Sequence, residues 1–332
     1  MSEMFSFDSD EHPGDEAFEH YRLLYAGGSD VERTADPFHA RVRGWRLDRT
    51  LLFTRAYGGV RHRRRERVAS DGFDHFVLHH VVGGELLGGP DGAPTAVGPG
   101  ETLLLDTRRP MENGARDVDL VTVSLARDAV RAAAGHPDEL HGRRIAAKDG
   151  VFLATLLRTL VAEAPRLPPG TLSTATRMLV DALSMAVNPA GQGARSDFYR
   201  LEYARREAAQ RLIEARLDAR DFSIAEITTE MGTSRATLYR LFEAQGGVLR
   251  YIQLRRLQRL RDRLDDRSFD RHPLADLAVL SGFSGESHAG RLFKQVFGIP
   301  PGAYRAASIR GTRVPSVDLM ARRWIASMAE LD

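Results

Sequence analysis

The last third of the chain shows a helical hydrophobic pattern that is broken by glycine-containing turns. Ser223 and Glu226 have the spacing of a capping box, which predicts a helix start. Gly232 ends this helix, and after the N-cap candidate Ser234 a second helix is predicted from Arg235 to about Gln245. The apolar side of the second helix is given by Leu238, Leu241 and Phe242. Two short helices joined by a tight turn form a helix-turn-helix unit.

The same plan returns from Pro273 onward. Pro273 lies in the first turn of a predicted helix, Ser281-Gly282 forms the turn after it, and Phe283 is expected to anchor the corner. A recognition helix is then predicted from Gly285 to about Phe297. The apolar positions of the two helices are Leu274, Leu277, Ala278 and Leu280, then Leu292, Phe293, Val296 and Phe297. The chain therefore carries two helix-turn-helix units in tandem.

A helical pattern also connects the two units. Apolar residues recur every three or four positions at Tyr251, Leu254, Leu257, Leu260 and Leu264. This spacing predicts one helix of roughly 18 residues, about 27 Å long. Successive major grooves on one face of B-DNA lie ~34 Å apart, so two recognition helices held by this connector could enter adjacent grooves without dimerisation. The tandem arrangement points to double-stranded DNA as a partner.

Two sequence runs carry a family resemblance. ITTEMGTSRATLYRLFEAQGG and LADLAVLSGFSGESHAGRLFKQVFGIPPGAYR resemble the paired DNA-binding units of the AraC/XylS family of bacterial transcription regulators, over about the last third of the chain. The resemblance implies base-edge contacts from Ala236, Tyr239, Arg240, Ser287, His288 and Arg291, and Arg235 and Lys294 complete the predicted DNA-binding set. One departure is Ala289-Gly290, where the family usually has a bulky apolar residue followed by Ser or Thr. Glycine inside a helix predicts a looser second recognition helix.

The charge distribution agrees with a DNA-binding C-terminal part. Residues 198–306 contain 19 Lys and Arg against 14 Asp and Glu, whereas the whole chain has a net charge of +2. Nearly all of this positive charge is arginine, which suits both phosphate and guanine edges. The connector arginines are Arg255, Arg256, Arg259, Arg261 and Arg263. We expect most of them to form a solvated helix face, partly paired with Asp262, Asp265 and Asp266.

The overall composition limits the class of protein. The chain has 332 residues, 42% of them hydrophobic and 28% charged, which is enough for two or three globular domains and excludes a wholly disordered protein. It has no cysteine, which excludes disulfides, thiolate metal sites and a cysteine redox sensor. Residues 1–30 lack the apolar core of a secretory signal, and no stretch of 18 apolar residues spans a membrane. We therefore expect a soluble cytoplasmic protein.

Residues 38–124 change to short segments rich in Val, Leu, Phe and Thr, which predicts β-structure. The predicted strands are Leu51–Tyr57, His75–Val82, Thr102–Asp106 and Asp119–Ser124, divided by turns at Gly83-Gly84, Gly88-Gly89-Pro90, Gly92 and Gly98-Pro99-Gly100. Pro99-Gly100-Glu101 resembles the turn into a buried strand of a cupin-like barrel, the usual sensor domain in the AraC/XylS family. The predicted fold class is α+β and multidomain: an N-terminal cupin-like β-barrel with flanking helices, and a C-terminal all-α domain of two helix-turn-helix units joined by a long helix.

Cupin enzymes bind metal through clustered His and Glu, so His75, His79, His80 and Glu85 were considered as ligands. Adjacent strand residues face opposite sides, so only His75 and His79 share a face, and a metal site needs three or four ligands. We therefore predict no metal site and expect partly exposed strand histidines. A histidine lining an effector cavity is an open alternative.

The β region also contains a basic run and a tryptophan. The basic run at residues 61–65 is expected to be a solvated strand end or turn, with binding of an anionic ligand or an acidic surface as the alternatives. Trp45 is expected to belong to the core.

Residues 127–188 return to helical patterns, with amphipathic segments at 151–161 and 172–185. Such helices either pair two chains or close the core of the sensor, so a homodimer stays open. Residues 188–197, NPAGQGARSD, are the linker candidate. The predicted domains are 1–126 for the effector-sensing β domain, 127–190 for a helical linker or dimerisation region, 198–306 for the DNA-binding domain and 307–332 for a C-terminal tail.

Together these features predict a transcription regulator and not an enzyme. Its N-terminal domain would bind a small-molecule effector, its C-terminal units would bind promoter DNA, and RNA polymerase is an expected partner. No catalytic residue and no cofactor are predicted. Two alternatives stay open: a cupin-type metal enzyme fused to a DNA-binding module, and an effector-independent regulator that acts through a protein partner. The sequence does not fix the effector.

Overall fold

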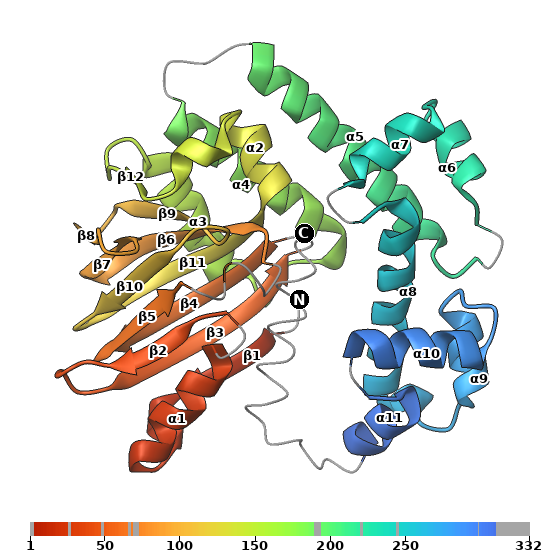
Figure 1. Cartoon of the computed structure of the whole chain (residues 1–332), viewed down its shortest axis with the longest axis horizontal. Helices are drawn as coiled ribbons and strands as arrows, with labels where there is room; N and C mark the ends of the chain where they lie inside the picture. The colour runs from red at the N-terminus through yellow and green to blue at the C-terminus, as the bar shows by residue number, and fades with distance from the viewer. Residues whose placement is uncertain are drawn as a thin grey trace. The chain divides into compact units, whose positions relative to one another are not determined.

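The structure is a computed structural model that describes residues 3–309 except 26–27, 48–49, 66–67, 69–72, 189–193, 220–221, 244–245 and 298. The chain divides into two compact units, one within residues 1–200 and the other within residues 201–316 (Figure 1). The first unit contains two β-sheets with helices, and the second is helical. The predicted α+β fold class is confirmed.

The first unit is built from two antiparallel sheets. The seven-stranded sheet has the order β1 (Glu3–Asp8), β3 (His39–Leu47), β4 (Thr50–Gly58), β11 (Val118–Ala126), β6 (His75–Gly84), β9 (Thr102–Asp106) and β12 (Arg143–Ile145). The five-stranded sheet has the order β2 (Asp30–Arg33), β5 (Val60–Arg64), β10 (Met111–Ala115), β7 (Leu86–Pro90) and β8 (Thr95–Val97). Apolar side chains of both sheets and of helix α1 (Gly14–Tyr25) form one core, as a cupin-like barrel requires.

The four predicted strands are confirmed as β4, β6, β9 and β11, the most apolar strands of the seven-stranded sheet. The turn before β9 is also as predicted, with Gly100 at φ +84° and its amide donating to the carbonyl of Val81. The turn predicted at Gly88-Gly89-Pro90 is wrong, because these residues lie in strand β7 and pair with β10. Glycine at position 88 allows the side chain of Leu103 to approach the backbone of β7, because a Cβ on Gly88 would lie 2.9 Å from that side chain.

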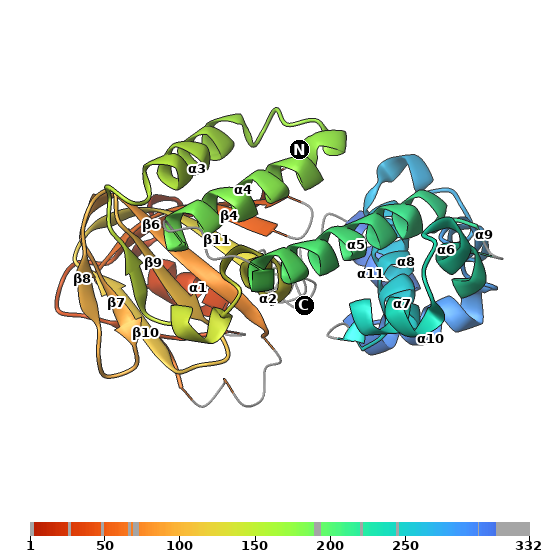
Figure 2. The same ribbon diagram turned by 90° about the horizontal axis from the view of Figure 1, so that it is seen from above.

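Three helices follow the sheets: α2 (Arg127–Ala134), α3 (Val151–Glu163) and α4 (Leu172–Val187). Helices α3 and α4 cover the outer face of the seven-stranded sheet (Figure 2), and the Thr176 hydroxyl donates to the carbonyl of Leu47 at 3.1 Å. Both predicted helical segments are confirmed, and they leave the apolar residues Val151, Met178 and Met185 exposed. The linker prediction is wrong at its end, because Ala194 already begins helix α5 (Ala194–Arg216).

The second unit contains α6 (Ile224–Glu230), α7 (Arg235–Leu241), α8 (Val248–Asp265), α9 (Leu274–Leu280), α10 (Glu286–Phe297) and α11 (Pro301–Ile309), together with the C-terminal part of α5. Helix α8 has 18 residues, as predicted. Its first half places Val248 and Ile252 in a core with α5, α6 and α7. Its second half places Leu257, Leu260 and Leu264 in a core with α9 and α10. One helix thus belongs to both hydrophobic cores.

The prediction of a solvated arginine face on α8 is wrong. Arg256 donates to the carbonyls of Leu217 and Ala219 at 3.0 and 2.7 Å, and Arg259 pairs with Asp218 at 2.8 Å. Arg255 pairs with Glu214, and Arg263 with Asp218 and the Ser281 hydroxyl. The predicted pairing with Asp262 is found, for Arg261. Four of them, Arg255, Arg256, Arg259 and Arg263, hold the C-terminal end of α5, where carbonyl groups without helical partners attract cations. We call this set of contacts the arginine clamp.

Candidate nucleic-acid interface and ligand cavity

The first helix-turn-helix unit has the predicted starts for both helices. Ser223 caps α6 by accepting from the amide of Glu226, whose side chain accepts from the amide of Ser223. Ser234 caps α7 by accepting from the amide of Thr237. Helix α7 is shorter than predicted and ends at Leu241, because buried Phe242 turns the chain toward Gly246 and Gly247, both at positive φ.

Four of the predicted DNA-binding residues lie on the exposed side of α7: Arg235, Ala236, Tyr239 and Arg240. Leu238 and Leu241 are buried on its opposite side. The Arg240 guanidinium lies 3.5 Å from the Glu202 carboxylate of α5 and is still more than half exposed. The exposed side of α7 thus presents a flat aromatic ring and two guanidinium groups to solvent, which are groups that contact bases and phosphates.

The second unit presents a similar surface on α10. Ser287, Arg291 and Lys294 are exposed, while Ala289 and Phe293 are buried. His288 is half-buried, with its ring against the edge of Phe283 and its Nδ1 atom 3.4 Å from the Ser284 hydroxyl. Leu280 and Val296, predicted on apolar sides, are exposed. The turn before α10 needs Gly282, at φ +82°, since a Cβ there would lie 2.2 Å from the carbonyl oxygen of Leu217.

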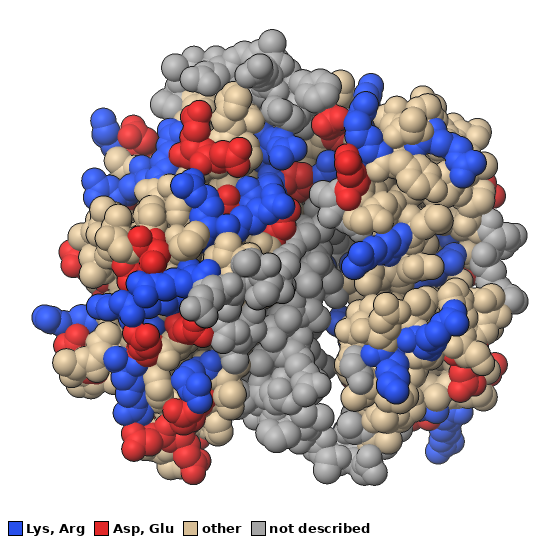
Figure 3. Space-filling view, viewed as in Figure 1, with Lys and Arg blue, Asp and Glu red and all other residues tan. Residues whose placement is uncertain are grey.

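Helices α7 and α10 lie on the same side of α8 (Figures 1 and 2). On the face of the second unit seen in Figure 3, basic side chains are spread over the surface and acidic ones lie toward its edges. With a rise of 1.5 Å per residue, the 18 residues of α8 separate its ends by about 27 Å. The two exposed helices are therefore held apart on one side of a single rigid element.

A cavity lies between the two sheets of the first unit. It encloses about 650 Å³, including its open mouth, and both sheets and α1 line it. Its apolar wall is formed by Leu24, Phe53, Phe73, Val77 and Met111, and its polar wall includes Arg55, His62, Arg64, His75, His79, Asn113, Thr122 and Ser124. An apolar wall with a few converging polar groups is typical of sites for small organic molecules.

The histidines that line this cavity are neutral. Burial lowers the pKa of His75 to about 3, with Arg64 and Arg127 contributing, and burial lowers the pKa of His79 to about 3, with Arg55 contributing. Burial and the neighbouring Arg55 hold the pKa of His62 well below its usual range. The Nε2 atom of His62 lies 3.0 Å from the Tyr21 hydroxyl, and Nδ1 of His79 lies 3.0 Å from the Thr122 hydroxyl. They therefore act as hydrogen-bonding groups without charge.

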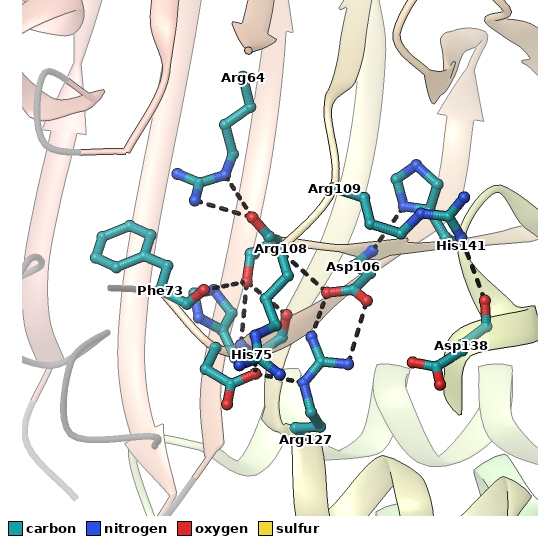
Figure 4. Close-up of polar contacts among 11 residues, drawn as sticks. Arg64, Phe73, His75, Asp106, Arg108, Arg109, Arg127, Asp138 and His141 are labelled. Atoms are coloured by element: carbon teal, nitrogen blue, oxygen red, sulfur yellow. Dashed lines mark hydrogen bonds and ion pairs between the residues drawn. The ribbon is translucent and has the colours of Figure 1, made fainter. Parts of the chain in front are cut away.

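One wall of the cavity is fixed by a network of arginine contacts (Figure 4). Arg64 donates to the carbonyl of Thr107 through Nε and Nη2, at 3.1 and 2.9 Å. The Thr107 hydroxyl donates to the carbonyl of His75 at 2.7 Å. Arg127, at the start of α2, pairs with both Asp106 and Asp74. The cavity residues Arg64, His75 and Thr107 are thereby held in place by contacts with backbone groups of Gly28, Phe73, His75 and Thr107.

Two family models match separate parts of the chain. A helix-turn-helix domain family matches residues 227–307, and an AraC-binding-like domain family matches residues 28–187. The transcriptional activator NphR of Rhodococcus sp is 32% identical over 139 residues, which are 42% of this chain and 39% of NphR. The chain belongs to the AraC family. It has a helix-turn-helix domain and, before it, an AraC-binding-like domain, in the order that the sequence resemblance predicted.

A solved structure shows the same fold as this AraC-family chain. The structure of the AraC-like transcriptional activator CuxR aligns with a TM-score of 0.54 at 24% sequence identity, over 77% of this chain and 94% of CuxR. The match with NphR is shorter than the match with CuxR, because it spans about two fifths of the length of NphR.

The prediction of partly exposed histidines is wrong for this AraC-family sensor. His75, His79 and His80 are each at most 2% exposed, because β6 is covered on both faces. His75 and His79 share the cavity face, as the strand period predicted, and His80 lies on the other face with its Nδ1 atom 3.1 Å from the Thr102 hydroxyl. Glu85 is exposed and does not line the cavity. Among the residues that the structure describes, no group of three or more His, Asp or Glu could hold a metal ion.

The prediction that residues 61–65 form a solvated strand end or turn is also wrong in part. The run forms most of β5, where His62 and Arg64 point into the cavity and are buried, while Arg61 and Arg65 are exposed. Trp45 is buried, as predicted. The sequence interpretation missed Arg55, whose only signal is a charge in the inward row of β4, between Phe53 and Tyr57.

Proposed function

We propose that this AraC-family chain is a transcription regulator that binds promoter DNA through α7 and α10 and responds to a small molecule bound in the cavity of its sensor unit. The main support for DNA binding is that α7 and α10 are both exposed on one side of α8. Arg235, Ala236, Tyr239 and Arg240 of α7, with Ser287, His288, Arg291 and Lys294 of α10, are the proposed DNA-contacting residues. The name of NphR favours activation, with RNA polymerase as the partner.

The proposed control is a shift between populations. A ligand that binds one state of the sensor unit better than another changes the population of each state by its differential affinity. A chain of contacts joins the cavity to the helical part of the sensor. Thr107 lines the cavity, and the residue before it, Asp106, is the last residue of β9. Asp106 pairs with Arg127, the first residue of α2. Ligand contact with this wall would therefore bias the position of α2.

Two further properties are proposals of the same kind. Val151, Phe152, Met178 and Met185 form exposed apolar surface on α3 and α4, which supports a homodimer through these helices. Light scattering of the purified chain would measure its oligomeric state. No helix in the described part of the chain is long and apolar enough to cross a membrane, and we propose that the protein acts in the cytoplasm, where promoter DNA lies.

The test of DNA binding is selection of genomic fragments from the organism that encodes the chain. We expect the purified protein to retain a few promoter-proximal sites, each with two half-motifs one helical turn apart. An Arg240→Ala/Arg291→Ala variant should lose these sites. Arg211→Ala, which removes one charge from the exposed surface of α5, is the control and should retain them. Retention of all fragments without dependence on Arg240 and Arg291 would contradict sequence-specific binding.

A further inference from the structure

Arg55 is a buried cation inside the cavity of the sensor unit. It lies in β4, is 6% exposed and lines the cavity. A guanidinium group stays protonated in proteins, so its positive charge is present in the core at all physiological pH values. Removal of a charge from water is costly unless an opposite charge or several hydrogen bonds replace the lost hydration.

The contacts of Arg55 replace little of that hydration. Its Nη2 atom lies 3.5 Å from the Tyr21 hydroxyl and 3.4 Å from Nε2 of His62, near the limit of hydrogen bonding, and its Nε atom has no partner. The guanidinium carbon lies 5.2 and 4.8 Å from the ring centres of Tyr25 and Tyr57. All of these partners are neutral. Within the part of the chain that the structure describes, no carboxylate pairs with Arg55.

The same cavity contains two more buried polar atoms without partners, Nδ1 of His75 and the hydroxyl of Ser124. Buried polar groups in proteins are almost always hydrogen-bonded, so three side chains that each turn an unpartnered polar atom toward one cavity point to a polar ligand there. The Arg64 guanidinium, by contrast, donates to the backbone carbonyls of Thr107 and Gly28.

We propose that the cavity binds a small organic monoanion, a carboxylate on an apolar and preferably aromatic body, with Arg55 as the partner of the carboxylate. This inference rests on the proposed function, since it names the class of effector. Phe53, Phe73 and Met111 provide the apolar contact surface, and the unpartnered atoms of His75 and Ser124 offer further hydrogen bonds. One negative charge balances Arg55. Arg64, the other guanidinium on the wall, already donates to the backbone carbonyls of Thr107 and Gly28, and the histidines are neutral.

The charge and shape of the cavity select against other ligand classes. A cation would face the uncompensated charge of Arg55. Inorganic phosphate would bring up to two negative charges and leave the aromatic wall uncovered. A neutral amide of the same shape would fill the cavity but leave Arg55 without a counter-charge. The carboxylate and its amide therefore form a matched pair of probes.

The experiment measures binding of benzoate and of benzamide to the full-length chain by thermal shift and calorimetry. At a concentration ten times its Kd, benzoate is expected to raise the melting temperature of the sensor unit by about 3–5 °C. Benzamide is expected to bind at least tenfold more weakly. Equal binding of the two probes, or no binding of benzoate, would overturn the proposal. Retention of genomic fragments by the same preparation, measured in parallel, shows separately whether the proposed DNA-binding function holds.

Two variants locate the site. Arg55→Met removes the charge and keeps the length of the side chain, so the benzoate shift should disappear while the ligand-free melting temperature stays equal or rises. Arg61→Gln removes an exposed arginine from neighbouring β5 and should keep the benzoate shift. A full benzoate shift in Arg55→Met would overturn the proposal. If Arg55→Met has no cooperative melting transition, Arg55→Lys replaces it. Arg55→Lys is expected to weaken benzoate binding by at least threefold and to leave benzamide binding unchanged. An unchanged Kd for benzoate in Arg55→Lys would also overturn the proposal.

Discussion

At the scale of single residues, the chain uses glycine in two opposite ways in its second helix-turn-helix unit. Gly282 has φ +82° and no room for a Cβ, because the carbonyl oxygen of Leu217 would lie 2.2 Å away. Gly290 lies inside α10, and a Cβ there would meet no atom within 4 Å. Gly282 is therefore required by the turn. Gly290 is not required by packing, and it lowers the stability of α10 because glycine loses more conformational freedom on folding than alanine does.

The first prediction follows from this contrast. Gly290→Ala should raise the free energy of unfolding of the second unit by about 0.5–1 kcal/mol, because alanine has the higher helix propensity. Gly282→Ala should lower it by more than that amount, since it meets both backbone strain and a clash. Urea unfolding followed by circular dichroism at 222 nm measures both. An unstable Gly290→Ala variant would show that the open space beside α10 is needed.

A second residue-scale prediction concerns the buried histidines. The pKa of His79 is lowered to about 3 in the folded chain by burial and by Arg55, whereas the unfolded chain has the ordinary value near 6.5. Below pH 6.5 the unfolded state therefore binds more protons, so stability is full above this pH and is lost as pH falls toward 3. The loss should be about 1 kcal/mol per pH unit for each such histidine.

His79→Gln should flatten this dependence, since glutamine does not titrate. Urea unfolding at pH 7.5, 6 and 5, followed by Trp45 fluorescence in a Trp324→Phe background, measures the slope. His288→Gln, which changes a half-buried histidine of the second unit, is the control and should leave the slope of the first unit unchanged. Equal slopes for His79→Gln and the unchanged chain would mean that His79 is not held neutral.

At the scale of elements, a capping box fixes where the first helix of the first helix-turn-helix unit begins. The reciprocal capping box between Ser223 and Glu226 satisfies two amide groups at the start of α6, a helix of only seven residues. Ser223→Ala should lower the free energy of unfolding of the second unit by about 1 kcal/mol. Thr229→Ala, an exposed substitution within α6, should be neutral or slightly stabilising. Thermal melts of the two variants compare them directly, and an equal effect would contradict a capping role.

The element scale also explains what could be predicted from sequence. Strands β4, β6, β9 and β11 were predicted because Leu, Val and Phe are frequent along them when both faces are counted. Strand β5, Val-Arg-His-Arg-Arg, was mistaken for a solvated run because its inward positions carry His62 and Arg64. Strand β10 places Asn113 at the cavity and β7 contains two glycines. The patterns of β5 and β10 are thus obscured by the polar residues that line the cavity, and the pattern of β7 is obscured by its glycines.

The arginine clamp was missed for a related physical reason. A charged face on a helix usually contacts solvent, and its partners here, Glu214, Leu217 and Asp218, lie about forty residues earlier in the chain. Local spacing contains no information about such tertiary contacts. The helix-turn-helix units were predicted almost completely because their caps, turns and apolar faces are local.

At the scale of the whole DNA-binding unit, the rigid connector leads to a prediction about operator spacing. Helix α8 belongs to both cores and fixes the distance between α7 and α10. Insertion of 5 base pairs between the two half-motifs should weaken binding at least about tenfold, because one recognition helix loses its base contacts, each worth about 1–3 kcal/mol. Insertion of 10 base pairs restores the face of the duplex but exceeds the reach of α8, so it should weaken binding equally.

Electrophoretic mobility shifts with the natural, +5 and +10 operators measure this dependence at one salt concentration. Recovery of affinity at +10 would indicate a flexible tether between the two units and would contradict the rigid connector.

The shared helix α8 also affects how such a regulator can acquire new targets. The distance between α7 and α10 depends on buried residues of α8, whereas under the proposed function the selected bases would depend on exposed residues of α7 and α10. Exposed substitutions usually change stability little, so the preferred bases can vary freely among descendants of this gene. The spacing of the operator, by contrast, is inherited with the core, and new binding sites would be recruited from promoters that already have that spacing.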